Sequence, residues 1–201
     1  MPEPSHPEAT TPGPREIEAL ARRIDRPVVL VGMMGVGKTS VGKRLAAVLK
    51  FGFVDADEAI EEAAHMAIPE IFERFGEDYF RGGERRVIAR LLDASQGGAG
   101  PGTGKVIATG GGAFVDPATR ALILERGIAV WLDSDVDTLL DRVARNANRP
   151  LLRHGDPRET LTRLKTEREP LYREAPIHIQ SRPGPHQRIV AAILRGLEQW
   201  R

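Results

Sequence analysis

Cysteine is absent from the 201 residues, so the chain can form no disulfide, no thiolate nucleophile and no cysteine-ligated metal site. Long apolar runs are absent as well, and no stretch approaches the roughly 20 residues that a helix needs to cross a bilayer. The opening segment, MPEPSHPEATTPGP, has neither the charged start nor the apolar stretch of a secretion signal. We therefore expect a cytoplasmic protein with no membrane partner.

An excess of charge of one sign is also lacking. The 29 basic and 28 acidic residues give a net charge of +1, so no overall positive field points to nucleic acid as a partner. The composition, 41% hydrophobic and 28% charged, is that of a globular protein, and the length suits a single domain. We predict one domain over residues 15–201, preceded by a disordered tail at residues 1–14 that is rich in proline and small polar residues.

Short apolar segments alternate with helical patterns along the chain. The β-branched run Val28–Val31 is typical of a strand buried on both faces, and further strands are expected at residues 51–54, 105–109, 128–132 and 177–179. Apolar spacing predicts helices at residues 15–23, from about 38, 58–64, 69–75, 79–92, after Asp116-Pro117, 136–143 and 187–200. This alternation predicts an α/β fold, a three-layer doubly wound sandwich with a mainly parallel sheet of about five strands.

The most specific motif is Gly32–Thr39, GMMGVGKT, which satisfies every position of G-x-x-x-x-G-K-[ST] and lies between a predicted strand and a predicted helix. In such a loop the backbone N–H groups and the helix N-terminus surround phosphate, a lysine (here Lys38) adds a point charge, and a hydroxyl (here Thr39) binds Mg²⁺. The glycine-rich stretch that ends at Gly104-Lys105 fails two positions and precedes a strand. We predict that ATP is bound by Gly35, Val36, Gly37, Lys38, Thr39 and Ser40.

Two carboxylates, Asp55 and Asp57, stand at the carboxyl end of the second predicted strand. That edge is where open α/β sheets bind ligands, and residues two apart on an extended chain point the same way. One carboxylate would serve a metal-bound water and the other a substrate hydroxyl. Asp57 is alternatively a helix N-cap. Asp133, at the end of the apolar run 128–132, is a rival acid for the metal, and we favour Asp55 because a second acid accompanies it.

Four further motifs follow in order: FRGGE at 80–84, GGG at 110–112, RPLL at 149–152 and REPLY at 168–172. With the phosphate loop and DAD, their order and spacing resemble the shikimate kinase family over residues 27–197, a combination far more specific than the loop alone. The resemblance implies a fold like that of P-loop nucleoside monophosphate kinases. It also implies a monomer that uses ATP and Mg²⁺ to phosphorylate the 3-hydroxyl of shikimate, a step of aromatic amino acid biosynthesis.

On the substrate side, the resemblance implies that Arg81 and Arg168 hold the carboxylate of shikimate, because a planar guanidinium suits bidentate recognition. Asp57 would bind ring hydroxyls and accept the proton of the attacking one, and Asp55 would serve Mg²⁺ through water. Another hydroxyl would bind backbone N–H groups where a side chain would block the approach. The resemblance implies that the N–H of Gly111 makes this contact, and that Gly110 and Gly112 beside it also belong to the substrate-binding residues.

On the nucleotide side, the resemblance implies that Arg149, in a polar lid at about 146–157, folds over the ATP phosphates. Arg142 would lie against adenine, and Glu84 would orient Arg81. The implied catalytic residues are therefore Lys38, Asp57 and Arg149.

Two departures from the family pattern stand out. The position expected to contact adenine falls near Pro185, which has no side-chain donor, so Arg182 or Gln187 would have to substitute. Gly82 and Gly83 lie inside a predicted helix, where each costs about 1 kcal/mol relative to alanine.

Two other classes of protein share the phosphate loop. A nucleoside monophosphate kinase, or another small-molecule kinase such as gluconate kinase, is the nearer alternative, and the arginine pair with the triple glycine counts against it. A regulatory GTPase or ATP-driven switch is the other alternative. The sequence contains no N-K-x-D motif for guanine, which counts against a GTPase.

Overall fold

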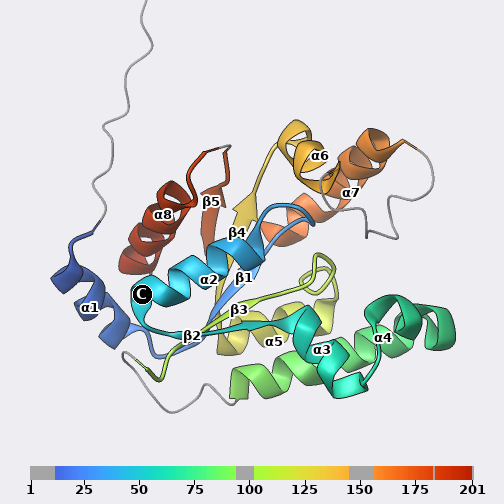
Figure 1. Ribbon diagram of the computed structural model, residues 1–201, viewed down its shortest axis with the longest axis horizontal. Helices are drawn as coiled ribbons and strands as arrows, with labels where there is room; N and C mark the ends of the chain where they lie inside the picture. Colours follow the sequence, from blue (N-terminus) through green and yellow to red (C-terminus); the bar gives the residue numbers. More distant parts are fainter. Residues whose placement is uncertain (1–11, 94–101, 145–155, 183, 201) are drawn as a thin grey trace, which may run out of the picture.

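The computed structural model describes residues 12–93, 102–144, 156–182 and 184–200 (Figure 1). Over these residues the strands form one five-stranded sheet in the order β2-β3-β1-β4-β5, and every pairing is parallel. The predicted sheet is therefore confirmed. The strands are β1 (Val28–Val31), β2 (Gly52–Asp55), β3 (Lys105–Ala108), β4 (Ile128–Asp133) and β5 (Ile177–Gln180).

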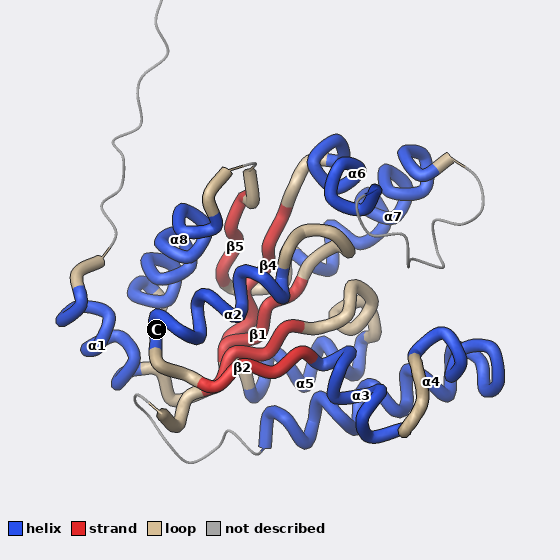
Figure 2. Tube along the Cα trace, in the orientation of Figure 1, coloured by secondary structure: helices blue, strands red, loops and turns tan. Residues whose placement is uncertain are grey.

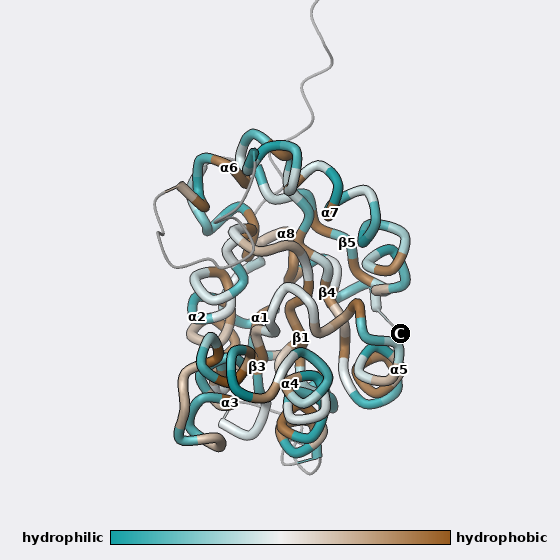
Figure 3. The backbone as a smooth tube through the Cα atoms, turned by 90° about the vertical axis from the view of Figure 1, so that its right-hand side faces the viewer, coloured by the Kyte–Doolittle hydropathy of each residue, from teal (hydrophilic) through white to brown (hydrophobic). Residues whose placement is uncertain are grey.

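Helices cover both faces of this sheet, which gives the three predicted layers (Figures 2 and 3). Figure 3 shows the strands between α2 on one side and α5 on the other, and α8 packs against α2 and β5. The helices are α1 (Pro14–Arg23), α2 (Lys38–Leu49), α3 (Ala56–Ala64), α4 (Ile68–Asp93), α5 (Pro117–Arg126), α6 (Val136–Ala144), α7 (Pro157–Tyr172) and α8 (His186–Gln199).

The central strands β1 and β4 form the middle of the hydrophobic core. Every residue of β1 is fully buried, as are Ile128 to Val130 of β4, because helices exclude water from both faces. The alternating pattern of a half-exposed strand is therefore missing here, as the β-branched run Val28–Val31 predicts. At the edge, β5 does alternate, with Ile177 and Ile179 buried and the residues between and after them exposed.

Helix α4 differs from the sequence prediction of two helices at 69–75 and 79–92. The two segments join into one helix with a kink at Gly76, whose φ of 79° and ψ of 178° are non-helical. A positive φ of this kind favours glycine, so the break falls where the sequence permits it. The other predicted ends differ from the structure by one or two residues, and α1 begins at Pro14, one residue before the predicted domain start. No range was predicted for α7.

The parallel strands bring four chain segments to one edge of the sheet. The phosphate loop follows β1, Asp55 ends β2, the glycine segment Gly110–Gly112 comes two residues after β3, and Asp133 ends β4. No helix in the described part of the chain is long and apolar enough to cross a membrane.

Candidate active site

The phosphate loop connects β1 to α2 with the geometry of an anion cradle. Gly35 and Gly37 have φ values of 79° and 97°, which only glycine adopts without strain, and α2 begins directly afterwards. The buried ammonium of Lys38 donates to the carbonyl oxygens of Gly32 at 2.7 Å and Met33 at 3.0 Å. A helix N-terminus, a turned backbone and a lysine thus meet at one point, as phosphate binding requires.

The predicted metal-side pair is in contact. The hydroxyl of Thr39 donates to Asp55 Oδ2 at 2.7 Å, beside the phosphate loop. The rival acid, Asp133, is instead ion-paired with Lys165 and lies 3.6 Å from His178 Nε2. Hydroxyl and carboxylate oxygens suit a hard cation such as Mg²⁺. Since the described residues contain no group of three or more histidine or acidic side chains that could hold a metal ion, a cation at this pair would also need phosphate and water oxygens.

Asp57 does not occupy the position that an extended chain would give it. Asp55 ends β2 and is itself the N-cap of α3, because its Oδ1 accepts the N–H of Asp57 at 3.1 Å. The interpretation of Asp57 as the cap is therefore wrong, and so is the idea that both carboxylates lie on one extended strand. Asp57 lies in the first turn of α3, and its Oδ1 would be 2.7 Å from a Cβ at Gly110. The glycine lets this carboxylate lie against the backbone.

Arg81 is held in place by two carboxylates of its own helix. Its Nη1 donates to Glu84 Oε2 at 2.7 Å, and its Nη2 lies 3.1 Å from Glu77. Burial raises the pKa of the Glu84 carboxyl against the opposing effect of Arg81, whereas Glu84 and Glu77 raise the pKa of Arg81 despite its own burial. The guanidinium is therefore cationic at neutral pH, and its Nη2 would be 2.5 Å from a Cβ at Gly112.

The second arginine and a tyrosine reach the same glycine segment from α7. Arg168 Nη1 donates to the carbonyl oxygen of Gly111 at 3.3 Å, and the hydroxyl of Tyr172 donates to that oxygen at 2.5 Å. On its other side, a Cβ at Gly111 would be 3.2 Å from the backbone nitrogen of Met34 in the phosphate loop. The glycine segment therefore separates the phosphate loop from Asp57 and the two arginines. Sequence reasoning missed Tyr172, which appears there only as the last letter of REPLY.

The predicted adenine residue, Arg142, donates to the carbonyl oxygen of Val36 at 2.9 Å and to Ser181 Oγ at 3.3 Å. Burial lowers the pKa of this arginine. His186, at the start of α8, is a second residue that the sequence analysis missed. Its partial burial, then Arg44 and then Arg142, lower the pKa of its imidazole, so it is neutral at pH 7.

The remaining predicted residues are three exposed side chains and one residue that the structure does not describe. Ser40 is exposed in the first turn of α2, and Arg182 and Gln187 are exposed. Arg149 lies outside the described residues, as does the predicted lid except for its last two residues, Asp156, which caps α7, and Pro157, which begins it.

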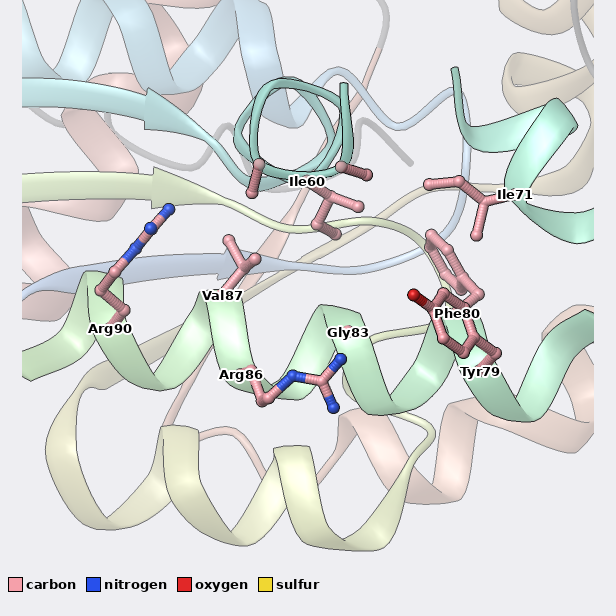
Figure 4. Close-up of a pocket in the computed structure, with 10 residues that line it drawn as sticks. Ile60, Ile71, Tyr79, Phe80, Gly83, Arg86, Val87 and Arg90 are labelled. Atoms are coloured by element: carbon pink, nitrogen blue, oxygen red, sulfur yellow. The ribbon is translucent and has the colours of Figure 1, made fainter. Parts of the chain in front are cut away.

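A separate pocket of about 340 Å³ lies between α3 and α4 (Figure 4). Its floor is apolar and includes Ile60, Ile71, Phe80 and Val87, with the side chains of Arg86 and Arg90 at its border. None of its lining residues belongs to the phosphate loop or to the glycine segment, so it is not part of the site described above.

A phosphate loop between β1 and α2 of a parallel sheet defines the class: this is a P-loop α/β domain with the arrangement of a small-molecule kinase. A family model described as shikimate kinase matches residues 34–198. The chain belongs to the shikimate kinase family.

Close relatives span nearly the whole chain. A shikimate kinase of Novosphingobium aromaticivorans is 67% identical over 186 residues, which cover 92% of this chain and 94% of that protein. A shikimate kinase of Rhodopseudomonas palustris is 53% identical, covering 93% of this chain and 88% of that protein. The predicted family is thus confirmed by proteins of similar length.

Comparison with solved structures supports the same fold. The shikimate kinase of Acinetobacter baumannii in complex with shikimate has a TM-score of 0.78 and 38% identity, and covers 91% of this chain and 96% of its own. A gluconokinase of Sinorhizobium meliloti has a TM-score of 0.58 at 20% identity, covering 88% of this chain and 94% of its own. At that identity the likeness shows the fold alone, so the gluconate kinase alternative shares the architecture and not the family.

Proposed function

We propose that this chain transfers the γ-phosphate of ATP to the 3-hydroxyl of shikimate and so forms shikimate 3-phosphate and ADP. The observation that carries the proposal is the glycine segment Gly110–Gly112. Its neighbours are the phosphate loop on one side and a carboxylate with two guanidinium groups on the other. A polyhydroxylated acid bound there would have its carboxylate near the arginines and a hydroxyl near the nucleotide phosphates.

The substrate carboxylate binds Arg81 and Arg168, because paired guanidinium groups form several charge-assisted hydrogen bonds to one carboxylate. Glu84 keeps Arg81 in position through the 2.7 Å ion pair. The backbone of Gly110–Gly112 approaches the ring closely, and its N–H groups donate to a ring hydroxyl. These contacts orient the substrate and restrict its freedom before the reaction.

Asp57 acts as the general base. Its carboxylate accepts the proton of the attacking hydroxyl while the new oxygen–phosphorus bond forms and the bond to the β-phosphate oxygen breaks, leaving ADP. Thr39 and Asp55, the latter through water, hold Mg²⁺, which supplies positive charge to the β- and γ-phosphates when bound. Lys38 adds a further positive charge at the same phosphates.

The rest of the nucleotide binds the loop and its surroundings. Arg142 contacts adenine from its anchored position at Val36. Arg149 contributes a positive charge over the phosphates, a role that rests on the family motif RPLL alone. We further expect the protein to act as a cytoplasmic monomer, as the resemblance implies.

A coupled ADP-release assay tests the proposal. The substrates compared are shikimate, gluconate, a nucleoside monophosphate and water alone, each with ATP and Mg²⁺. Shikimate should raise ADP release by at least about a hundredfold over the others, since its ring holds the carboxylate and the hydroxyls at fixed separations, whereas gluconate is an open chain that must be ordered on binding. ADP release that does not depend on shikimate would instead indicate a bare ATPase, and preference for gluconate would favour the alternative kinase.

A further inference from the structure

To bind a substrate hydroxyl, the glycine segment must hold its backbone N–H groups in one orientation, although glycine has the least restricted φ and ψ of any residue. Three consecutive glycines have no Cβ to restrict φ and ψ, so ordering each of them costs more conformational entropy than ordering any other residue. The carbonyls of Gly110 and Gly112 accept backbone N–H groups from Ala113 at 3.3 Å and Val115 at 3.0 Å. The N–H groups of Gly111 and Gly112 have no acceptor among the described residues. They are therefore available to a ligand.

The carbonyl of Gly111 differs from its two neighbours because, among the described residues, the donors to it are side chains. Both donors come from the last turn of α7, Arg168 at 3.3 Å and Tyr172 at 2.5 Å. The hydrogen bond from Arg168 is at the long end of the N–H···O range, and in the proposed function the guanidinium of Arg168 binds the substrate carboxylate instead. Once Arg168 binds substrate, Tyr172 is the remaining donor to this oxygen among the described residues.

Tyr172 is itself fixed in place. Its side chain is 1% exposed, and its ring stacks between Phe114 and Trp131 with centroid distances of 6.3 Å and 6.0 Å. Burial raises the pKa of its hydroxyl to about 12, so the hydroxyl stays protonated and donates at every physiological pH. A rigid, permanently protonated donor is suited to holding one peptide group.

We propose that Tyr172 is a positioning residue for substrate binding: its hydroxyl fixes the peptide group between Gly111 and Gly112. In a planar trans peptide the C=O and N–H point in opposite directions, so holding the oxygen at Tyr172 directs the N–H of Gly112 away from α7. Without this bond the peptide can rotate between its two glycines, and a carbonyl acceptor would then face the substrate hydroxyl in place of the N–H donor. The inference rests on the proposed function and adds a residue to it.

The substitution Tyr172→Phe tests this role because it removes the hydroxyl and keeps the stacked ring. The KM for shikimate should rise by about tenfold, because one hydrogen bond to the substrate is no longer well oriented, while the KM for ATP stays within about twofold. Ser134→Ala is the matched control, since it also removes a buried hydroxyl that donates to a backbone carbonyl, that of Ser181 at 2.8 Å. The control should leave the KM for shikimate within about twofold of wild type.

A purely structural role would lower the melting temperature and leave the KM for shikimate unchanged, or raise both KM values together, and either result overturns the proposal. If the variant does not fold, the amide resonance of Gly112 in ¹⁵N-labelled wild-type protein replaces it as the probe. Shikimate should shift that resonance, and an unchanged resonance contradicts the proposal. Wild-type turnover with shikimate is measured in the same assay. If the wild type shows none, the proposed function itself is refuted; if only the expected effect of Tyr172→Phe is missing, the role of Tyr172 is refuted and the proposed function stands.

Discussion

The phosphate side and the acid side of the site are built in different ways. The phosphate side is built mainly from one continuous segment, Gly32–Ser40, whose conformation is set by its own glycines and by the start of α2, with Asp55 of β2 beside it. The acid side brings together Asp57 of α3, Arg81 of α4, the glycine segment after β3, and Arg168 of α7. A local backbone motif therefore makes one half, and long-range packing makes the other.

The two halves also differ in what holds them. The phosphate loop follows a fully buried central strand, and the side chains of Lys38 and Arg142 donate to its backbone carbonyls. On the acid side, ion pairs between side chains, such as Arg81 with Glu84, hold the groups in place. The glycine segment lies between them, in contact with Met34 of the loop and with Asp57 and Arg81. Substitutions in one half should therefore affect one ligand and leave the other nearly unchanged.

The largest effect is expected from Lys38→Met on the phosphate side. Turnover should fall by at least about a thousandfold, because phosphoryl transfer depends on charge neutralisation at the transferring group. The fold should persist, since methionine has a similar length and occupies the same buried position. Steady-state ADP release and a circular dichroism melt measure both. Turnover within about tenfold of wild type would exclude this loop as the catalytic cradle.

Asp57→Asn should follow, with a loss of turnover of about 10²–10⁴-fold, because an amide cannot accept the proton of the attacking hydroxyl. ATP affinity, measured by calorimetry, should be nearly unchanged, since the proposed role of Asp57 is toward the substrate hydroxyl and its carboxylate lies against Gly110. Asp55→Asn is the companion variant and should mainly raise the Mg²⁺ concentration required. Equal losses of ATP affinity and turnover in Asp57→Asn would assign it to the metal side.

A smaller effect is expected from Arg81→Lys. The KM for shikimate should rise by about tenfold, because a lysine cannot form the planar fork that binds a carboxylate through two hydrogen bonds. Arg74→Lys on the same helix is the control, since Arg74 forms only an exposed ion pair with Glu70 at 2.9 Å and should change nothing measurable. If both variants behave alike, Arg81 has no special role in binding the acid.

The smallest effect concerns stability at high pH. The pKa of Tyr172 rises from 10.0 to about 12 on folding, so its contribution is complete below the unfolded value and is lost as pH rises through the folded one. Between about pH 8 and about pH 11, wild type should lose about 1.4 kcal/mol of unfolding free energy relative to Tyr172→Phe. Urea titrations of both proteins at the two pH values measure the difference between their unfolding free energies. If that difference is the same at both pH values, the hydroxyl is not buried in solution.

The contrast between a local motif on the phosphate side and long-range packing on the acid side also explains which features the sequence predicted well. The phosphate loop is contiguous, so its glycines, Lys38 and Thr39 could be assigned from a motif, and the five strands from their apolar runs. Thr39 and Asp55 were both predicted at the carboxyl edge of the sheet, and the structure joins them by a hydrogen bond of 2.7 Å that the sequence did not predict. The family resemblance supplied Arg81 and Arg168, which no local rule would have paired.

Other features depend on boundaries and distant packing that a sequence does not display. The helix α3 starts at Ala56, so Asp55 rather than Asp57 became its cap, a difference of two residues that periodicity cannot resolve. Tyr172 lies 61 residues from Gly111, and its role depends on a hydrogen bond to a backbone oxygen. His186 was missed because its neighbours, Arg44 and Arg142, come from two other helices.

Separate binding of the two ligands to Lys38→Met and Arg81→Lys, measured by calorimetry, tests the division of the site most directly. Lys38→Met should bind shikimate with a dissociation constant within about threefold of wild type and lose affinity for an ATP analogue, and Arg81→Lys should show the reverse. If each variant weakens both ligands to the same extent, the two halves act as one unit and the division described here is wrong.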